Sequence, residues 1–170
     1  TSVRLEFLQS FQPGIIYTIH ATSNISDCTG NSIGMNDSAR FAIPDTAQPN
    51  DVVINEILFN PRTTGYDFVE FYNRSNKVID LSNIEVRRID FNNSLNVLGV
   101  CNASDESFLL FPNQYVALTE NRDDILMNYY VQEPDKLLAT SLPNFPDDEG
   151  ICVIKVRNGI TIDSLYYSNK

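Results

Sequence analysis

Few side chains in this sequence are of the types that carry out chemistry. The 170 residues include one histidine, no tryptophan and three cysteines. Cys28, Cys101 and Cys152 lie far apart and form no CxxC motif, so they allow at most one internal disulfide with one thiol left over. Because cysteine is among the most buried residue types, we expect buried free thiols. His20 has no second histidine or serine elbow near it, so we expect an ordinary strand histidine.

The densest acidic cluster is Asp147, Asp148 and Glu149, followed by Gly150. Carboxylate oxygens on a turn are the ligands that Ca²⁺ prefers. Calcium loops place their ligands at alternate positions, however, and three adjacent acids lack that spacing. These residues are therefore only a weak metal candidate, and a solvated turn is the expectation. The sequence predicts no cofactor and no catalytic residue.

Glu56 and Glu70 lie in neighbouring strand candidates. A glycosidase needs at least two carboxylic side chains, one on each side of the bond that it cleaves. Most sheets offer such a pair, and both residues alternate with apolar side chains. We therefore expect each glutamate to face solvent or to pair with Arg87 or Arg88 across the sheet. Catalysis by this pair is not predicted, and the chain is expected not to be an enzyme.

The aromatic residues could instead bind a ligand, since eight tyrosines and ten phenylalanines could stack on sugars or on nucleic-acid bases. The best candidates for exposure are the pairs Tyr129–Tyr130 and Tyr166–Tyr167, because adjacent residues of a regular element cannot both point inward. In each pair we expect one tyrosine in the core and one on the surface.

Charge and hydropathy exclude two classes of partner. Twelve Lys and Arg stand against twenty-two Asp and Glu, which gives a net charge of −10 and no basic stripe. The sequence therefore argues against direct nucleic-acid binding. No segment contains the roughly 18 consecutive apolar residues of a membrane span. The first residues, Thr1 to Phe7, do not resemble a signal region, and we expect a piece that starts within a longer protein.

The elements that must position these residues are short strands. Alternating apolar runs are separated by turn residues every 8 to 12 residues or so, which is typical of an all-β sandwich. In the larger C-terminal part the predicted strands are 52–59, 67–73, 84–89, 108–111, 114–119, 151–156 and 160–165. Val69 and Phe71 should share the buried face of their strand, with Glu70 pointing the other way. Asn158-Gly159 predicts a hairpin between the last two strands.

One helix is predicted over residues 121–130. Asn121 can cap its N-terminus, two aspartates follow in the first turn, and the apolar residues recur at helical spacing. In the N-terminal part, 3–7 and 15–21 alternate and are expected to form an antiparallel hairpin, followed by a strand at 39–43. Residues 44–50 carry two prolines and no apolar periodicity, so a domain boundary is predicted there.

Several segments resemble a known family. Val53 to Ile57, Asp67 to Asn73 and Ile79 to Asn83 are similar to the opening strands of bacterial lamin tail domains. Ser141 to Gly150, Ile151 to Lys155 and Gly159 to Tyr166 are similar to the closing strands. The resemblance covers roughly residues 50–170, with the segments in the family's order. Residues 1–48 resemble the last strands of a bacterial Ig-like domain, through Tyr17-Thr18, Asp27, Gly30-Asn31 and Phe41.

The resemblance implies an immunoglobulin-like antiparallel β-sandwich over residues 49–170, preceded by a truncated Ig-like domain over 1–48. Such a fragment could leave strand edges open to dimerisation. It also implies a non-catalytic, extracytoplasmic interaction or scaffold module of a larger bacterial surface protein, with a protein or a surface glycan as partner. Two alternatives stay open: a carbohydrate-binding module that uses exposed aromatic residues, and an accessory domain of a secreted nuclease or hydrolase.

Overall fold

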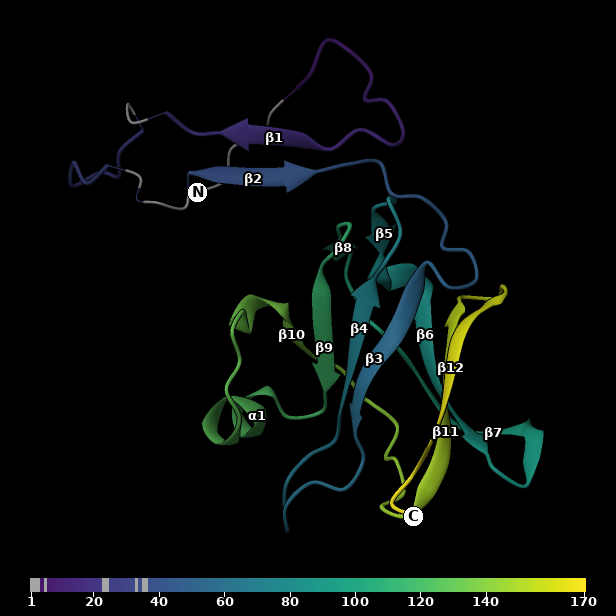
Figure 1. Ribbon diagram of the computed structural model, residues 1–170. Helices are drawn as coiled ribbons and strands as arrows, with labels where there is room; N and C mark the ends of the chain where they lie inside the picture. The colour runs from purple at the N-terminus through teal and green to yellow at the C-terminus, as the bar shows by residue number, and fades with distance from the viewer. Residues whose placement is uncertain (1–3, 5, 23–24, 33, 35–36) are drawn as a thin grey trace.

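Two four-stranded sheets form the body of the molecule (Figure 1). The computed structural model describes residues 4, 6–22, 25–32, 34 and 37–170. The first sheet has the strand order β10 (Leu137–Ala139), β9 (Tyr115–Thr119), β4 (Phe68–Asn73), β3 (Val52–Leu58). The second has the order β12 (Thr161–Ser168), β11 (Glu149–Val156), β6 (Ile84–Asp90), β7 (Asn93–Asn102). A two-stranded sheet of β5 (Ile79–Asp80) and β8 (Leu109–Leu110) extends one end.

The core lies between the inner faces of the two large sheets. Along β4 the burial alternates, so that Val69 and Phe71 are fully buried while Glu70 lies on the outer face, as the sequence predicts. The second sheet contributes the alternate residues Cys152 and Ile154 of β11. This alternation confirms the all-β sandwich. One pairing departs from the antiparallel prediction, since the three residues of β10 run parallel to β9.

A β-bulge in β3 decides which of its residues enter the core. The pairing register with β4 shifts by one residue between Ile54 and Glu56. Strict alternation from Ile54 would have placed Glu56 inward and Ile57 outward. The bulge reverses both, so that Ile57 packs against the core and Glu56 faces away from it.

The two sheets are joined along one side by β3 and β12. The backbone N–H of Ile54 donates to Oδ2 of Asp163 at 2.9 Å, and the N–H of Asn50 donates to the carbonyl of Ile162 at 2.9 Å. Because β3 is the end strand of its sheet, the Ile54 N–H that points away from β4 has no neighbouring strand of the same sheet to bind. A side-chain carboxylate therefore completes the backbone hydrogen bonding at the seam.

The opposite side of the sandwich is closed by residues 140–146, which we call the strap. Its hydroxyl at Thr140 donates to the Asn102 carbonyl at 2.8 Å. Phe145 is fully buried in the core, and its backbone N–H donates to Oδ2 of Asp67 at 2.9 Å. These contacts give a structural reason for the Ser141 to Gly150 segment that the sequence analysis singled out.

Burial raises the pKa of the Asp67 carboxyl from its ordinary value near 3.8 to about 6, and the nearby charges of Asp147 and Glu120 add to the increase. The hydrogen bond from Phe145 acts in the opposite direction. The folded protein therefore binds more protons than the unfolded chain between about pH 4 and pH 6. Its stability should fall as the pH rises through that window, and the loss should be complete above about pH 6.

We expect Asp67→Asn to remove this contribution, because the amide oxygen can still accept the Phe145 hydrogen bond but carries no charge. The free energy of unfolding of the variant minus that of wild type should increase from pH 4 to pH 6, which means that the variant gains stability relative to wild type, and should stay level above pH 6. Urea unfolding of both proteins at several pH values measures the difference. Asp135→Asn, at an exposed site, is the control and should show no such trend. A pH-independent difference for Asp67→Asn would contradict the assignment.

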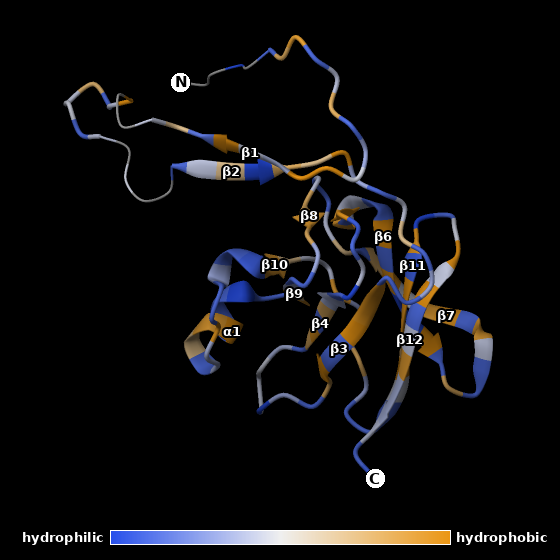
Figure 2. Ribbon diagram, turned by 45° about the horizontal axis from the view of Figure 1, so that its top comes forward, coloured by the Kyte–Doolittle hydropathy of each residue, from blue (hydrophilic) through white to orange (hydrophobic). Residues whose placement is uncertain are grey.

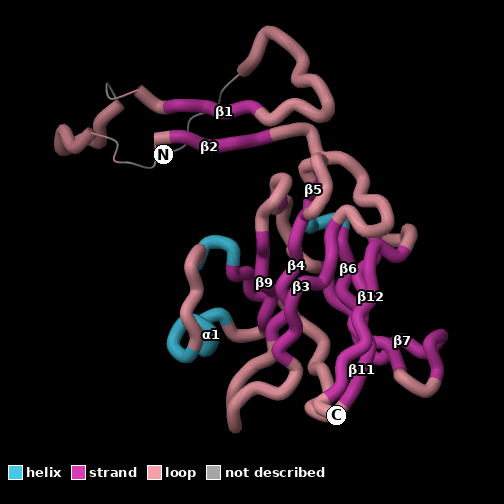
Figure 3. Tube along the Cα trace, in the orientation of Figure 1, coloured by secondary structure: helices cyan, strands magenta, loops and turns pink. Residues whose placement is uncertain are grey.

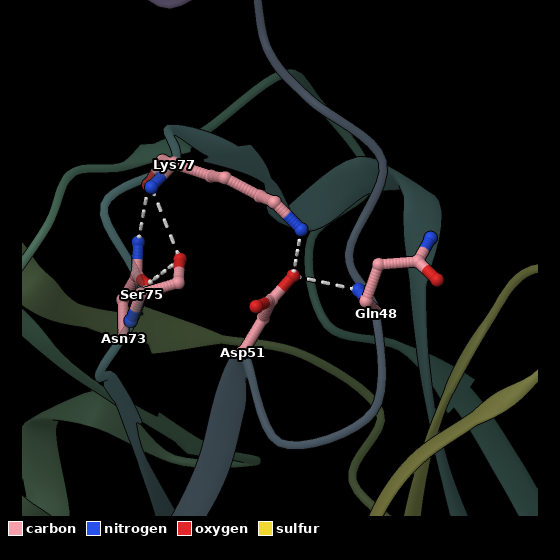
Figure 4. Close-up of polar contacts among 5 residues, drawn as sticks. All are labelled: Gln48, Asp51, Asn73, Ser75 and Lys77. Carbon is pink, nitrogen blue, oxygen red and sulfur yellow. Dashed lines mark hydrogen bonds and ion pairs between the residues drawn. The ribbon is translucent and has the colours of Figure 1, made fainter.

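A polar turn connects β4 to β5 (Figure 4). The fully buried side chain of Asn73 donates to the carbonyls of Lys77 at 2.8 Å and Leu110 at 2.9 Å, and its oxygen accepts from the Ser75 hydroxyl at 2.7 Å. Lys77 reaches Asp51 at 2.6 Å, and the same carboxylate oxygen accepts from the backbone N–H of Gln48. The network fixes the chain entering β3 against the turn leaving β4.

The predicted helix is confirmed as α1 (Arg122–Asn128), with the Asn121 side chain accepting from the backbone N–H of Asp124. Two short 3₁₀ segments, η1 (Leu81–Asn83) and η2 (Pro134–Lys136), complete the helical content of the described residues. Figure 3 shows α1 and η2 together on the β9 side of the first sheet. Ile125 is buried and attaches α1 to the sandwich. No helix in the described ranges is long and apolar enough to cross a membrane.

The N-terminal hairpin is formed by different strands from those predicted. Strand β1 (Tyr17–His20) pairs antiparallel with β2 (Ser38–Phe41), not with residues 3–7. The predicted strand 3–7 falls partly outside the described residues, and the described residues 4, 6 and 7 are not in a strand. Phe7 and Phe11 instead pack beside Phe41, with ring centroids 6.1 and 4.8 Å from it. Alternation indicates a strand but does not identify its partner.

Candidate binding groove

A concave surface lies where α1 and the following loop cover part of the outer face of the first sheet. We call it the groove, and its volume is about 440 Å³. Its floor is formed by β3, β4 and β9, and its wall by residues 129–133 together with Lys136. The lining residues are Glu56, Phe68, Glu70, Tyr115, Val116, Ala117, Ile125, Tyr129, Tyr130, Val131, Gln132, Glu133, Lys136 and Leu137.

The floor is a single row across the sheet. In the strand register Glu56 of β3 lies opposite Glu70 of β4, and Glu70 lies opposite Ala117 of β9. The bulge before Glu56 turns this side chain outward, so two carboxylates face the same groove. The methyl group of Ala117 leaves open space beside them, because a larger residue at this position would fill the floor.

The two floor carboxylates have no cationic partner among the residues that the structure describes. Glu70 accepts a hydrogen bond from the Asn55 amide at 2.8 Å, and the one lysine of the groove, Lys136, is held by Glu133 at 2.7 Å. Like charges directly opposite on neighbouring strands destabilise a sheet. The groove therefore carries negative charge that a cationic ligand would relieve.

Of the two alternatives expected for Glu56 and Glu70, the outward facing is confirmed and the pairing with Arg87 or Arg88 is wrong. Arg87 binds Glu85 of its own strand at 2.6 Å, and Arg88 donates to the Asn144 carbonyl at 2.8 Å. Both arginines belong to β6 in the second sheet, whereas the glutamates lie on the first. The sequence could not show which strands share a sheet, because β4 and β6 are separated by the excursion through β5.

Aromatic side chains flank the acidic floor. Tyr115 stacks on Tyr72 with ring centroids 4.6 Å apart, and Tyr129 meets Phe68 edge-on at 6.3 Å. Tyr130 is 91% exposed at the mouth of the groove. These rings offer flat apolar surface beside the carboxylates, an arrangement that suits cations through ring faces and carboxylates together.

The two tyrosine pairs behave largely as expected. Tyr167 is buried against Phe59, with ring centroids 4.3 Å apart, while Tyr166 is half exposed. Tyr129 is partly buried in the groove wall, and Tyr130 is the surface member of its pair. Gly150 makes room for Tyr167, since a Cβ at this position would overlap the tyrosine hydroxyl. Burial raises the pKa of the Tyr167 hydroxyl.

The acidic cluster 147–149 does not converge on one point. Asp148 accepts from the backbone N–H of Glu149, and Glu149 opens β11 and accepts from the Tyr166 hydroxyl at 3.0 Å. In the described part of the chain no three His, Cys, Asp or Glu residues are placed to hold a metal ion. His20 lies in β1 opposite Ser38 and is exposed.

The three cysteines are all free thiols. Cys101 and Cys152 are buried, as expected, but the expectation is wrong for Cys28, which is exposed in the loop between β1 and β2. Burial raises the pKa of Cys101 to about 11 and also raises that of Cys152. Both buried thiols are therefore held in the protonated, unreactive form at neutral pH.

The groove depends on residues that sequence reasoning did not select, namely Phe68, Ala117, Gln132 and Lys136. The available signal was the helix cap at Asn121, which placed a helix over one face of the sheet. The strand register decides which outer-face residues lie beneath that helix, and the sequence does not reveal this register.

These features define a class, a two-sheet β-sandwich module with a grooved outer face. The family model for the Lamin Tail Domain matches residues 45–169, and the chain belongs to this family. Lamin tail domains are a non-catalytic family. A comparison with curated proteins gave no match. The match begins within the predicted boundary segment and leaves out residues 1–44, so the Ig-like remnant, the division into two domains and the bacterial source stay predictions.

Proposed function

We propose that this lamin tail domain is a non-catalytic interaction module whose groove docks a basic segment of a protein partner. The observation that carries the proposal is the Glu56–Glu70 pair, which lies unneutralised beside exposed aromatic rings. An arginine or lysine side chain would meet both carboxylates and could stack on Tyr115 or Tyr130.

Binding of a lysine- and arginine-rich decapeptide, compared with the same peptide bearing glutamates, tests the proposal by calorimetry at two salt concentrations. The basic peptide should bind, and more weakly at the higher salt. Glu56→Gln should weaken this binding about threefold to tenfold, because it removes one partner of the cation without changing shape.

Glu106→Gln is the matched control, because it removes the same charge from an exposed site outside the groove. It should leave the affinity within experimental error. Equal binding of the two peptides, or equal loss of affinity in both variants, would show that the interaction is non-specific or lies elsewhere and would refute the proposal.

A glycan is the second candidate ligand, and the stacked Tyr72–Tyr115 pair beside two carboxylates favours it, since sugars pack on ring faces and hydrogen-bond to carboxylates. A glycan array screened with and without a chelator tests this alternative. Glycan binding that Tyr115→Ala abolishes would support the glycan alternative. An array on which no glycan binds would exclude it.

The proposal also covers the cellular location of the module and the kind of protein that contains it. We propose that it is an extracytoplasmic part of a larger bacterial surface protein, on the strength of its resemblance to exported family members. Sequencing the parent chain tests this: a signal peptide and further Ig-like repeats would support it, whereas a neighbouring nuclease or hydrolase motif would favour the accessory-domain alternative.

A further inference from the structure

The β6–β7 hairpin carries a feature that the groove does not use. Figures 1 and 2 both show it projecting beyond the rest of the second sheet. Strand β7 is the last strand of the order β12-β11-β6-β7, and no other strand pairs with its outer edge in the described chain. The strap contacts this edge at one end, where the Asn102 carbonyl accepts from the Thr140 hydroxyl. At ten residues it is the longest strand.

Apart from the strap contact at Asn102, this edge lacks the features that usually protect one. Proteins guard open edges with lysine, with proline or with short strands. Residues 91–104 contain no charged residue and no proline, although the chain as a whole has a net charge of −10. Leu95 is 91% exposed, and Val97, Leu98 and Val100 are also exposed.

The apolar surface continues inward from the edge across the outer face of the sheet. Val97 lies opposite Ile89, Ile89 opposite Ile151, and Ile151 opposite Tyr166, so that one row crosses all four strands. Phe91 packs on Tyr166 with ring centroids 5.3 Å apart, which widens the row. Contiguous apolar patches of more than a few hundred Å² mark interaction sites.

We propose that β7 pairs antiparallel with β7 of a second copy, which joins the two second sheets into one continuous sheet. The charge pattern favours this occupant. The partner of a neutral, apolar edge must itself offer a neutral, apolar strand, and a chain with a net charge of −10 can meet its own copy only where its charges are absent.

Pre-organisation also favours a second copy. Its β7 is already extended and held by β6, so pairing orders little new backbone, in contrast to a disordered peptide. Two identical antiparallel strands are related by a two-fold axis, which closes the assembly at a dimer. The groove lies on the first sheet, so each copy would keep its groove free.

Sedimentation velocity of the whole chain over a hundredfold range of concentration tests the proposal. The wild type should convert from monomer to dimer. Val100→Lys puts a charge on the exposed edge and should raise the dimer dissociation constant at least tenfold. Ile160→Lys is the matched control, since Ile160 is an exposed apolar residue in the β11–β12 turn, and it should dimerise as the wild type does.

A second measurement separates loss of pairing from loss of folding. Both variants should keep the wild-type melting temperature of the monomer within a few degrees. Hydrogen exchange should show β7 amides that are protected at high concentration and exposed at low concentration. A wild type that stays monomeric throughout, a dimer that Val100→Lys leaves intact, or protection on β12 in place of β7 would overturn the proposal.

Discussion

Val69→Asp or Phe71→Asp should leave residues 49–170 unfolded at room temperature. Both side chains are fully buried between the sheets, and Phe71 lies opposite Ile54 on one side and Val116 on the other. The buried cluster around them, among the described residues, is hydrophobic and offers a carboxylate no charged partner. An unpaired buried charge costs several kcal/mol, against a total stability of about 5 to 15 kcal/mol for a domain. Circular dichroism and thermal melts measure the outcome.

The intervening residue is the control. Glu70 lies on the outer face, in the groove, and Glu70→Gln keeps an oxygen that can accept from Asn55. Its melting temperature should stay within a few degrees of the wild type. A stable Val69→Asp variant together with an unfolded Glu70→Gln variant would mean that the facing of β4 is reversed.

The facing of β4 could be predicted because the charged Glu70 lies between the apolar Val69 and Phe71, and the burial alternates without interruption from Phe68 to Asn73. The facing of the side chains of β3 could not be predicted in full. Its sequence also looks regular, but the bulge at Asn55 moves Glu56 from the core side to the groove side. A bulge depends on how the partner strand and the seam with β12 fit, and neither is a local property of the sequence.

Strand β7 was not predicted because the alternation of Leu95 and Val97 is interrupted at Leu98 and Gly99. Its pairing with β6 shifts register twice, near Ile89. Gly99 falls inside it, which the strap explains, since a Cβ there would lie 2.9 Å from Pro143. Sequence rules treat such a glycine as a break, whereas here it allows a close approach of two segments far apart in the chain.

The candidate site was predictable in its parts but not as a whole. The sequence indicates the glutamates as a carboxylate pair and the tyrosines as candidates for exposed rings, namely Glu56, Glu70, Tyr129 and Tyr130. Their convergence follows from the register of three strands and from the direction in which the chain leaves α1. The capping signal at Asn121 specifies where the helix begins, but tertiary packing of Ile125 determines which face it covers.

The buried asparagine of the β4–β5 turn should be the most sensitive polar position. Asn73→Asp keeps the shape of the side chain but replaces its two donors by an oxygen that cannot donate to the carbonyls of Lys77 and Leu110. Two buried acceptors would then face an unsatisfied negative charge at a position with no exposed surface. We expect a loss of at least about 3 kcal/mol, measured by urea unfolding at neutral pH.

The same substitution three residues further on separates this effect from a general change of charge. Asn76 is exposed in the same turn, so Asn76→Asp should change the stability by less than about 0.5 kcal/mol. Lowering the pH should partly restore Asn73→Asp, because a protonated carboxyl regains one donor, and should leave Asn76→Asp unaffected. If both variants lost equal stability, the turn would be sensitive to charge alone, and the hydrogen bonds of Asn73 would not hold β4 to β5 and β8.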